Sequence, residues 1–409
     1  MRRIAWALML LFVFAIPWEY SLDLGEPFGN VARIAGILLL LAAVPAIVLS
    51  GRLRAPGPFQ WLTFAFFLWF CVSYFWTVDP AGTLIRLRAY FQEMMVVWFV
   101  WEFADTPADL RNLLRATVAG SWVLAILTLA AFRSPESIAA GLVRIAAYGQ
   151  DPNDLARYLD LGFPLAALLL ETERHWLLRT LAAGFLPIGL AAVLLTASRE
   201  GFVAAVIALI GSTILLARGH YGRIAAGIVA FPVVAAALWL AVPAGIATRL
   251  ATIPRELETG DLNQRINIWS AGWRAFAGNP LFGSGAGSFV VAARLAPGNT
   301  AHNTALSLVV GGGLCALVIA LLLAALAVRA AFQTSGPLRI ALITALLVWA
   351  ITTFVATVEE NRFTWLLLSL CVLAGRLAAE DPFTLATQFS SAPRLRLAPI
   401  PPLAAQPDC

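Results

Sequence analysis

His302 is the side chain best suited to proton transfer near neutral pH, because the unperturbed imidazole titrates close to that range. The other histidines, His175 and His220, fall in loops expected on the opposite side of a membrane. His302 precedes an apolar helix whose positive N-terminal end disfavours imidazolium, so the ring should be neutral and able to accept a proton. Asn303 is placed to orient it. A helix-capping surface histidine is the alternative interpretation, and the residues alone favour neither.

Two arginines are candidates for binding an anion. Arg199 stands at the start of an apolar helix, where a cation opposes the helix dipole at a cost of about 0.3–1 kcal/mol. A cation retained there favours an anion site over a snorkelling side chain, although Glu200 is a local partner that would neutralise it. Arg265 begins a second predicted helix, where a solvated residue on the polar face is the alternative.

Charged residues in or beside predicted membrane spans are further candidates. An intramembrane charge is often functional, and a structural Arg–Glu pair is the alternative for each. They are Arg86 and Arg88, which precede Glu93 in one span, and Arg362, which adjoins Glu359 and Glu360 between two spans.

The composition is that of an all-α integral membrane protein. Of its 409 residues, 60% are hydrophobic and 12% charged, and mean hydropathy is +0.82. Apolar stretches long enough to cross about 30 Å of hydrocarbon recur along the chain. About twelve transmembrane helices are predicted, centred near residues 10, 41, 67, 95, 122, 163, 186, 208, 232, 316, 347 and 370.

Twelve spans place both termini on one side, which the arginine distribution predicts to be cytoplasmic. All 28 basic residues are arginine. Fifteen fall inside and thirteen outside or near outer helix ends, which is a weak bias. Translocated loops normally avoid arginine, so an anionic substrate outside the cytoplasm is the economical explanation. The first span, after Arg2 and Arg3, is predicted to be a retained helix rather than a cleaved signal.

One long external loop, about 244–302, interrupts a membrane domain spanning 1–379. Residues 261–264 resemble a capping box, and Ile266, Trp269, Trp273 and Phe276 follow at helical spacing. They predict an amphipathic helix lying along the membrane surface and ending at Asn279-Pro280. The glycine-rich run 283–287 then predicts either an N–H nest for phosphate or a tight turn. Residues 380–409 are predicted to be a disordered cytoplasmic tail.

Several other classes of site are not indicated. The four cysteines show no metal-binding or disulfide spacing, so no metal or other cofactor is expected. No basic-aromatic pattern typical of a nucleic-acid surface occurs.

Several short motifs occur in a fixed order and on consistent predicted sides of the membrane. They are Trp76-Thr77-Val78-Asp79-Pro80, Asp151-Pro152-Asn153-Asp154-Leu155-Ala156, Thr196-x-Ser198-Arg199-x-Gly201, Arg265-x-x-x-Trp269, Asn279-Pro280-Leu281-x-Gly283-x-Gly285-x-Gly287-x-Phe289 and His302-Asn303. Together these motifs resemble those of the O-antigen ligase and polymerase superfamily, and the likeness covers roughly residues 60–376.

The resemblance implies a metal-independent, inverting glycosyltransferase that takes a glycan from undecaprenyl diphosphate at the periplasmic face of the bacterial inner membrane. It implies that Arg199 and Arg265 bind the diphosphate and that His302 is the general base, with Asn153 in a supporting role. One departure concerns Glu200, since the family often has Ser-Arg-Gly where this chain has Ser198-Arg199-Glu200-Gly201. A pair between Glu200 and Arg199 would weaken the anion site.

Alternatives remain within and outside this family. A ligase transfers the glycan to the lipid A core, whereas a polymerase transfers it to another lipid-linked glycan, and a third kind transfers it to protein. The single main external loop favours a ligase. A transporter is the distant alternative, because the candidate residues collect at one face and no internal repeat is evident.

Overall fold

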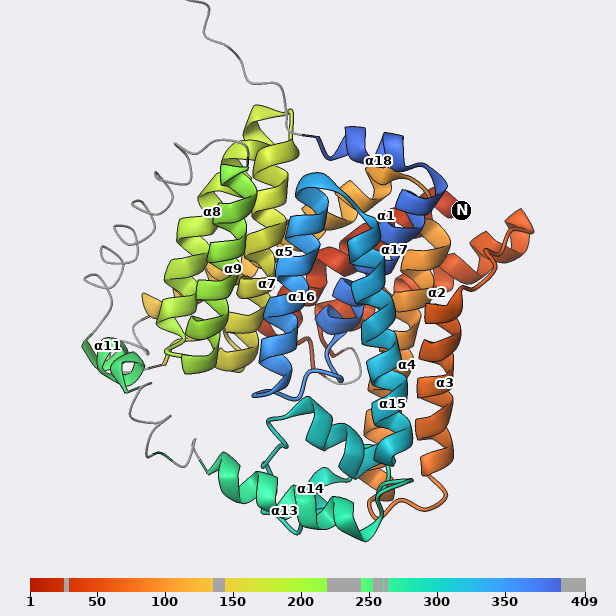
Figure 1. The fold of residues 1–409 in the computed structure, drawn as a ribbon, viewed down its shortest axis with the longest axis vertical. Helices are drawn as coiled ribbons and strands as arrows, with labels where there is room; N and C mark the ends of the chain where they lie inside the picture. Colours follow the sequence, from red (N-terminus) through yellow and green to blue (C-terminus); the bar gives the residue numbers. More distant parts are fainter. Residues whose placement is uncertain (26–28, 135–143, 219–243, 253–259, 261–263, 391–409) are drawn as a thin grey trace, which may run out of the picture.

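The protein, in this computed structural model, is all-helical, and residues 1–25, 29–134, 144–218, 244–252, 260 and 264–390 are described. No strand occurs among them beyond an isolated bridge between Asp23 and Asn30. Figure 1 shows long helices packed side by side, with shorter helices layered across their lower end. The helices of this bundle are α1 (Arg2–Ala15), which continues into the short 3-10 helix η1 (Ile16–Ser21), and α2 (Val31–Ser50), α3 (Pro58–Ser73), α4 (Pro80–Phe103), α5 (Pro107–Phe132), α7 (Pro152–Thr172), α8 (Trp176–Leu195), α9 (Arg199–Ala217), α15 (Thr304–Gln333), α16 (Gly336–Thr353) and α17 (Arg362–Glu380).

Eight helices among the described residues are long and apolar enough to cross a membrane. The predicted count of twelve is therefore only partly supported. Eleven of the twelve predicted centres lie within described helices, but α3 is short for a span, and α4 and α7 are not among the eight. The remaining centre, near 232, lies outside the described residues. The chain is thus a multi-pass membrane protein with at least eight candidate spans.

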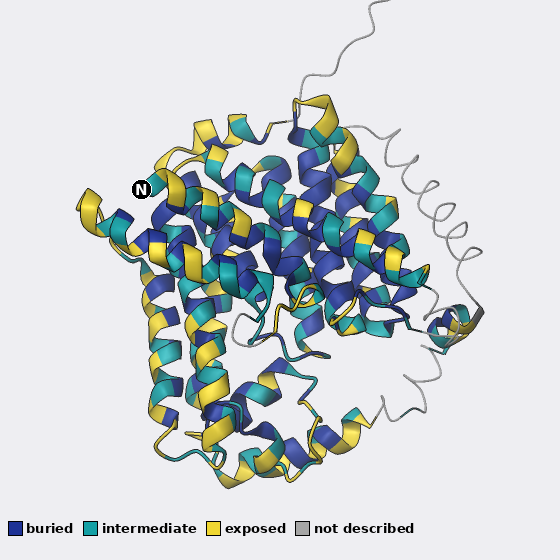
Figure 2. Ribbon diagram, turned by 180° about the vertical axis from the view of Figure 1, so that it is seen from behind, coloured by how far each residue is buried: buried dark blue, intermediate teal, exposed yellow. Residues whose placement is uncertain are grey.

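Two helices form the centre of the bundle. Nearly every residue of α7 from 155 to 169 is buried, as is most of α17. α7 packs against α5, α8, α9 and α16, while α17 packs against α4 and α15. Figure 2 shows this interior as predominantly buried ribbon. Because α7 contacts so many neighbours, its first turn is held rigidly, and the candidate site adjoins that turn.

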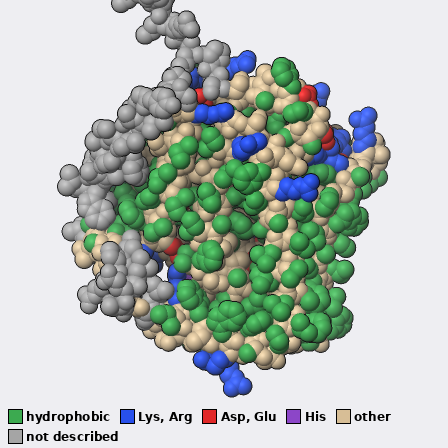
Figure 3. Space-filling view, in the orientation of Figure 1, with side chains coloured by type: hydrophobic (Ala, Val, Ile, Leu, Met, Phe, Trp, Pro, Cys, Tyr) green, Lys and Arg blue, Asp and Glu red, His purple; other side chains and the backbone are tan. Residues whose placement is uncertain are grey.

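The outer surface fits a lipid environment. In Figure 3 the visible face carries hydrophobic side chains over most of its height, with charged side chains mainly at its upper and lower edges. On α2, Ile37, Leu41 and Val44 are each about half exposed or more. Such a surface is stable where hydrocarbon covers it.

The predicted external loop contains three described helices: α11 (Ala244–Ala251), α13 (Arg265–Gly278) and α14 (Phe289–Ala292). α13 begins and ends where predicted, with Asn279 as its C-cap. The predicted apolar face is only partly correct. Ile268, Ala271 and Gly272 are buried against the protein. Ile266 is half exposed and Trp273 more than half exposed.

Two further expectations concern helix ends. Residues 261–263 of the predicted capping box lie outside the described residues, and Gln264 precedes α13 without a side-chain cap. The expected disorder of the tail is wrong for its first part, because α18 (Pro382–Gln388) forms there and packs against α5 and α17. Asp381 caps α18, and Leu385 and Phe389 are buried against the bundle, which explains the order. Residues 391–409 lie outside the described residues.

Candidate functional site

The start of α9 is fixed by a chain of small polar side chains. The Thr196 hydroxyl accepts a hydrogen bond from the Ser198 backbone N–H at 3.1 Å. Ser198 caps α9 by accepting from the Gly201 N–H, and its hydroxyl donates to Asn153 Oδ1 at 2.9 Å. A Cβ on Gly201 would lie 2.3 Å from that of Ala156, so only glycine permits this contact with α7. Asn153 therefore positions the α9 start.

Arg199 links the α9 start to α11. Its guanidinium donates to the Thr252 hydroxyl at 2.6 Å and to the Arg249 carbonyl at 3.4 Å. Arg249 in return donates to the Ala197 carbonyl at 3.2 Å. The two arginines thus connect the α9 start and the end of α11 in both directions. Sequence reasoning missed Arg249, although its place in the arginine-rich external loop was a usable signal.

Arg265, the first residue of α13, reaches across to α9. Its guanidinium forms an ion pair with Glu200 at 2.9 Å, and the two side chains are 14% and 12% exposed. The expected local partner of Glu200 was Arg199, but the structure places the Glu200 carboxylate against Arg265. This contact brings Arg265 beside the residue that follows Arg199, although 66 positions separate the two arginines in sequence.

His302 lies half-buried in the turn between α14 and α15. The turn is fixed to α13, because the Trp269 indole N–H donates to the Ala301 carbonyl at 3.0 Å. Asn303 caps α15 with its side-chain oxygen, and its amide donates to the Phe354 carbonyl at 3.1 Å. Asn303 therefore anchors the helix rather than the imidazole. Among the described residues, no side chain is hydrogen-bonded to the His302 ring.

Charges from the starts of two helices, α13 and α7, act on the imidazole. Burial lowers the pKa of His302 below its usual value, and the positive charge of Arg265 lowers it further. The carboxylates of Asp151 and Asp154 at the start of α7 act in the opposite direction but more weakly. Desolvation and a neighbouring cation both favour the neutral ring. The imidazole is therefore poised to accept a proton near neutral pH.

Backbone strain gathers at the same place. Four non-glycine residues have positive φ in the described chain: Ala197 at 48°, Gln264 at 64°, His302 at 45° and Arg294 at 54°. The first two directly precede the Ser198 cap and Arg265, and the third is the candidate base itself. A side chain in this left-handed region costs roughly 1–2 kcal/mol. Such strain clusters at functional sites.

We call the residues 197–200, 264–265 and 301–303 the helix-start cluster. The start of α7 borders it, where Asp154 pairs with the buried Arg157 at 2.8 Å. Sequence reasoning noted Asp154 only within a motif and assigned no role to Arg157. Polar residues buried at the first turn of an otherwise apolar helix were the available signal.

The remaining arginine candidates have different surroundings from those expected. Arg86 forms an ion pair with Glu360 rather than with Glu93. Arg362 pairs with Glu19 and donates to Gln92, not to its sequence neighbours Glu359 and Glu360. Arg88 is exposed on α4. Among the described residues, none of these three forms an ion pair or hydrogen bond with the helix-start cluster, although Arg86 lines a small cavity together with Ala301.

The glycine-rich run forms a tight turn against α15 rather than an open phosphate nest. Its N–H groups at Ser284 and Gly285 donate to the carbonyls of Val310 and Gly311 at 2.7 and 2.8 Å. Gly313 interrupts α15 with φ 68°, and a Cβ there would collide with the Leu281 carbonyl. The backbone donors are therefore already used. The turn instead holds the loop against the lower half of α15, whose first turn follows His302.

The fold and this site define an all-helical, multi-pass membrane protein with a polar cluster at the ends of its helices. Residues 184–321 match a family model described as O-antigen ligase. This match over part of the chain supports the O-antigen ligase and polymerase superfamily that the motifs indicated. The matched range contains the motifs from Thr196 to Asn303, and those at 76–80 and 151–156 lie outside it. No curated protein sequence matches the chain.

Proposed function

We propose that this protein is a glycosyltransferase that moves a glycan from undecaprenyl diphosphate to the lipid A core at the periplasmic face of the inner membrane. The observations that carry the proposal are the ion pair of Arg265 with Glu200, the neighbour of Arg199, and the electrostatic interaction of Arg265 with His302. Their residue types suit a reaction in which a diphosphate leaves and a hydroxyl loses a proton. The family match supports a lipid-linked glycan as the substrate.

The two arginines bind the diphosphate of the donor. Guanidinium groups match phosphate oxygens in a bidentate geometry and stay charged at any physiological pH. As the bond to the anomeric carbon breaks, negative charge grows on the leaving phosphate, and Arg199 and Arg265 stabilise it. Glu200 holds Arg265 at the α9 start before the donor arrives and releases it, wholly or in part, to the phosphate.

His302 acts as the general base. The acceptor hydroxyl oxygen attacks the anomeric carbon while undecaprenyl diphosphate departs with the bonding electrons. The hydroxyl proton passes to the neutral imidazole, so charge balances and the anomeric configuration inverts. Burial and the charge of Arg265 keep the imidazole neutral before the reaction. No protein nucleophile is required in this direct displacement.

A polymerase of the same superfamily is the second candidate, because the same cluster would serve a lipid-linked glycan as acceptor. A ligase is preferred because the described part of the loop consists of short helices, α11, α13 and α14, that pack on the bundle. This arrangement adds no separate acceptor-binding domain among the described residues. Transport is disfavoured, since the candidate residues lie at helix ends rather than on broken helices at mid-membrane.

An in vitro reaction tests the proposal. Purified protein is given a lipid-linked glycan of several repeats and lipid A core without added metal, and products are sized by gel and mass spectrometry. Glycan of unchanged length on the core is the expected result. Longer lipid-linked glycan with an untouched core would identify a polymerase, and labelled glycan crossing sealed vesicles without any transfer would identify a transporter.

A further inference from the structure

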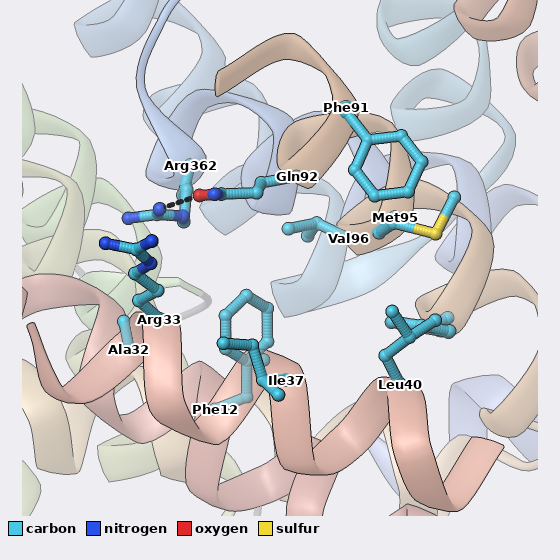
Figure 4. A pocket seen from close by; sticks show the side chains of 12 residues that line it. Phe12, Ala32, Arg33, Ile37, Leu40, Phe91, Gln92, Met95, Val96 and Arg362 are labelled. Atoms are coloured by element: carbon cyan, nitrogen blue, oxygen red, sulfur yellow. Dashed lines mark hydrogen bonds between the residues drawn. The ribbon is translucent and has the colours of Figure 1, made fainter. Parts of the chain in front are cut away.

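A cavity of about 230 Å³ lies between α1, α2 and α4, and no residue of the helix-start cluster lines it. Its two ends differ in chemistry. Figure 4 shows the guanidiniums of Arg33 and Arg362 next to each other at one end. The rest of the wall is apolar and includes Phe12, Leu40 and Met95. We call this cavity the arginine pocket.

The polar end carries an excess positive charge. Arg362 is paired with the buried carboxylate of Glu19 and donates to Gln92. Among the described residues, the Arg33 guanidinium has no ion-pair or hydrogen-bond partner. The lining contains two guanidiniums and no carboxylate, and Glu19 pairs with Arg362 alone, so among the described residues Arg33 has no counter-ion. An arginine in a membrane-spanning helix is costly unless an anion accompanies it.

The backbone holds Arg33 in this place. Gly29 has φ 68°, and a Cβ there would lie 2.9 Å from Cδ of Arg33 and from one of its guanidinium nitrogens. The Arg33 side chain therefore lies directly over Gly29, whose positive φ favours glycine. The Asn30 side chain accepts from the Arg33 N–H at 2.8 Å and fixes the first turn of α2. The guanidinium is thus preorganised toward the cavity.

The outer side of the pocket is a lipid-facing surface. Ile37 lines the cavity and is 49% exposed, and Leu41, one turn further along α2, is 66% exposed. A molecule entering between α2 and α4 therefore comes from the hydrocarbon layer. It must have an apolar chain for the wall and a negative group for the two arginines.

We propose that the arginine pocket binds one acidic phospholipid, with its phosphodiester between Arg33 and Arg362 and an acyl chain along α1, α2 and α4. The negative charge of a phosphodiester supplies the counter-ion that Arg33 lacks. Planar guanidiniums suit its two free oxygens. A zwitterionic phospholipid fits less well, because its ammonium group would lie near two arginines. This site does not depend on the transfer reaction proposed above.

Lipid titration of the purified full-length protein by native mass spectrometry tests the site. Phosphatidylglycerol and phosphatidylethanolamine with identical acyl chains are compared. We expect phosphatidylglycerol to bind more tightly. Arg33→Gln should weaken the affinity for phosphatidylglycerol roughly tenfold to a hundredfold and leave the affinity for phosphatidylethanolamine nearly unchanged. Arg3→Gln, an exposed arginine on α1, should keep the wild-type preference.

Further variants separate the contributions of charge and wall. Arg33→Lys keeps a point charge and should retain part of the preference. Leu40→Trp narrows the cavity and should weaken phosphatidylglycerol with both arginines intact. The result for each variant is the ratio of its affinities for phosphatidylglycerol and phosphatidylethanolamine. Because both affinities are measured on the same protein, a change in stability does not mimic a change in this ratio. An unchanged preference in Arg33→Gln, equal binding of both lipids by the wild type, or stronger binding of undecaprenyl phosphate would overturn the proposal.

Discussion

The helix-start cluster and the arginine pocket both present guanidiniums, yet they differ in what surrounds them. In the cluster, Arg265 lies beside a carboxylate and within electrostatic reach of an imidazole, and three adjoining residues have strained backbones. In the pocket, Arg33 and Arg362 face an apolar wall. Among the pocket's lining residues there is no histidine and no cysteine.

This difference distinguishes a site that can catalyse a reaction from a site that can only bind a lipid. A reaction needs a group that exchanges a proton at working pH, placed next to groups that stabilise leaving charge. Only the cluster contains both. The pocket offers charge and hydrocarbon contact, which suffice to hold a lipid. Arginine alone therefore does not distinguish the proposed reaction centre from a lipid site, whereas a half-buried, strained histidine beside it does.

Removal of the His302 imidazole should have the largest effect on the transfer rate. His302→Ala should lower the transfer rate by about 10²–10⁴-fold, the usual contribution of a general base. His302→Asn should lower it equally, and asparagine tolerates the left-handed backbone at this position. Initial rates of the in vitro reaction measure both effects.

The matched control is His175→Ala, since His175 is exposed in a loop before α8. It should transfer glycan at the wild-type rate. Full activity of His302→Asn in a correctly folded protein would remove the proposed base.

Removal of a cluster arginine should have the next largest effect. Arg265→Gln should lower the rate by about 10²–10³-fold, as expected for one lost donor to developing charge. Arg265→Lys should recover only part of it, because lysine lacks the bidentate geometry. Arg274→Gln, an exposed arginine on the same helix, should leave the rate unchanged. Equal rates for Arg265→Gln and Arg274→Gln would exclude Arg265 from the donor site.

The packing that positions the cluster can be disturbed without touching a charge. Gly201→Ala places a Cβ 2.3 Å from that of Ala156, and overpacking of this kind typically costs about 1–3 kcal/mol. We expect a lower Tm together with a lower rate, because α9 must shift away from α7. Gly278→Ala, where nothing lies within 4 Å of the added Cβ, is the control. A wild-type Tm for Gly201→Ala would show that this contact is not tight.

The smallest expected effect is a shift in pH dependence. Since burial and Arg265 lower the pKa of His302, the neutral ring persists below about pH 6.5, its ordinary midpoint. As the pH is lowered, the transfer rate should therefore begin to fall only below that pH. In Arg265→Gln the lost positive charge should raise the pKa, which NMR titration of labelled histidine would follow with His302→Ala for assignment. A midpoint that is unchanged or falls would contradict the electrostatic coupling.

Much of the fold could be predicted from the sequence, because apolar stretches of span length are a strong local signal. The first and last residues of α13 were also predictable, from the helical spacing of its apolar residues and from Asn279-Pro280, which ends the helix. The helix α18 was missed because its order depends on packing against α5 and α17. Composition alone carries no information about such a contact.

The candidate residues could be chosen from the sequence, but their partners could not. Motifs and position single out Arg199, Arg265 and His302 as candidates, yet the partner of Glu200 is 65 residues away. The same is true of Arg362, whose partner Glu19 lies near the other end of the chain. Long-range ion pairs follow from the tertiary arrangement of helix ends. Sequence neighbours therefore misled the assignment of both pairs.

The most direct test of the central claim is the binding of undecaprenyl diphosphate to the wild type and to arginine variants, measured without any acceptor. We predict that Arg199→Gln and Arg265→Gln each lose most of the affinity, while the exposed Arg274→Gln retains it. Wild-type affinity in both cluster variants would contradict the account. Loss in Arg33→Gln instead would move the donor from the helix-start cluster to the arginine pocket.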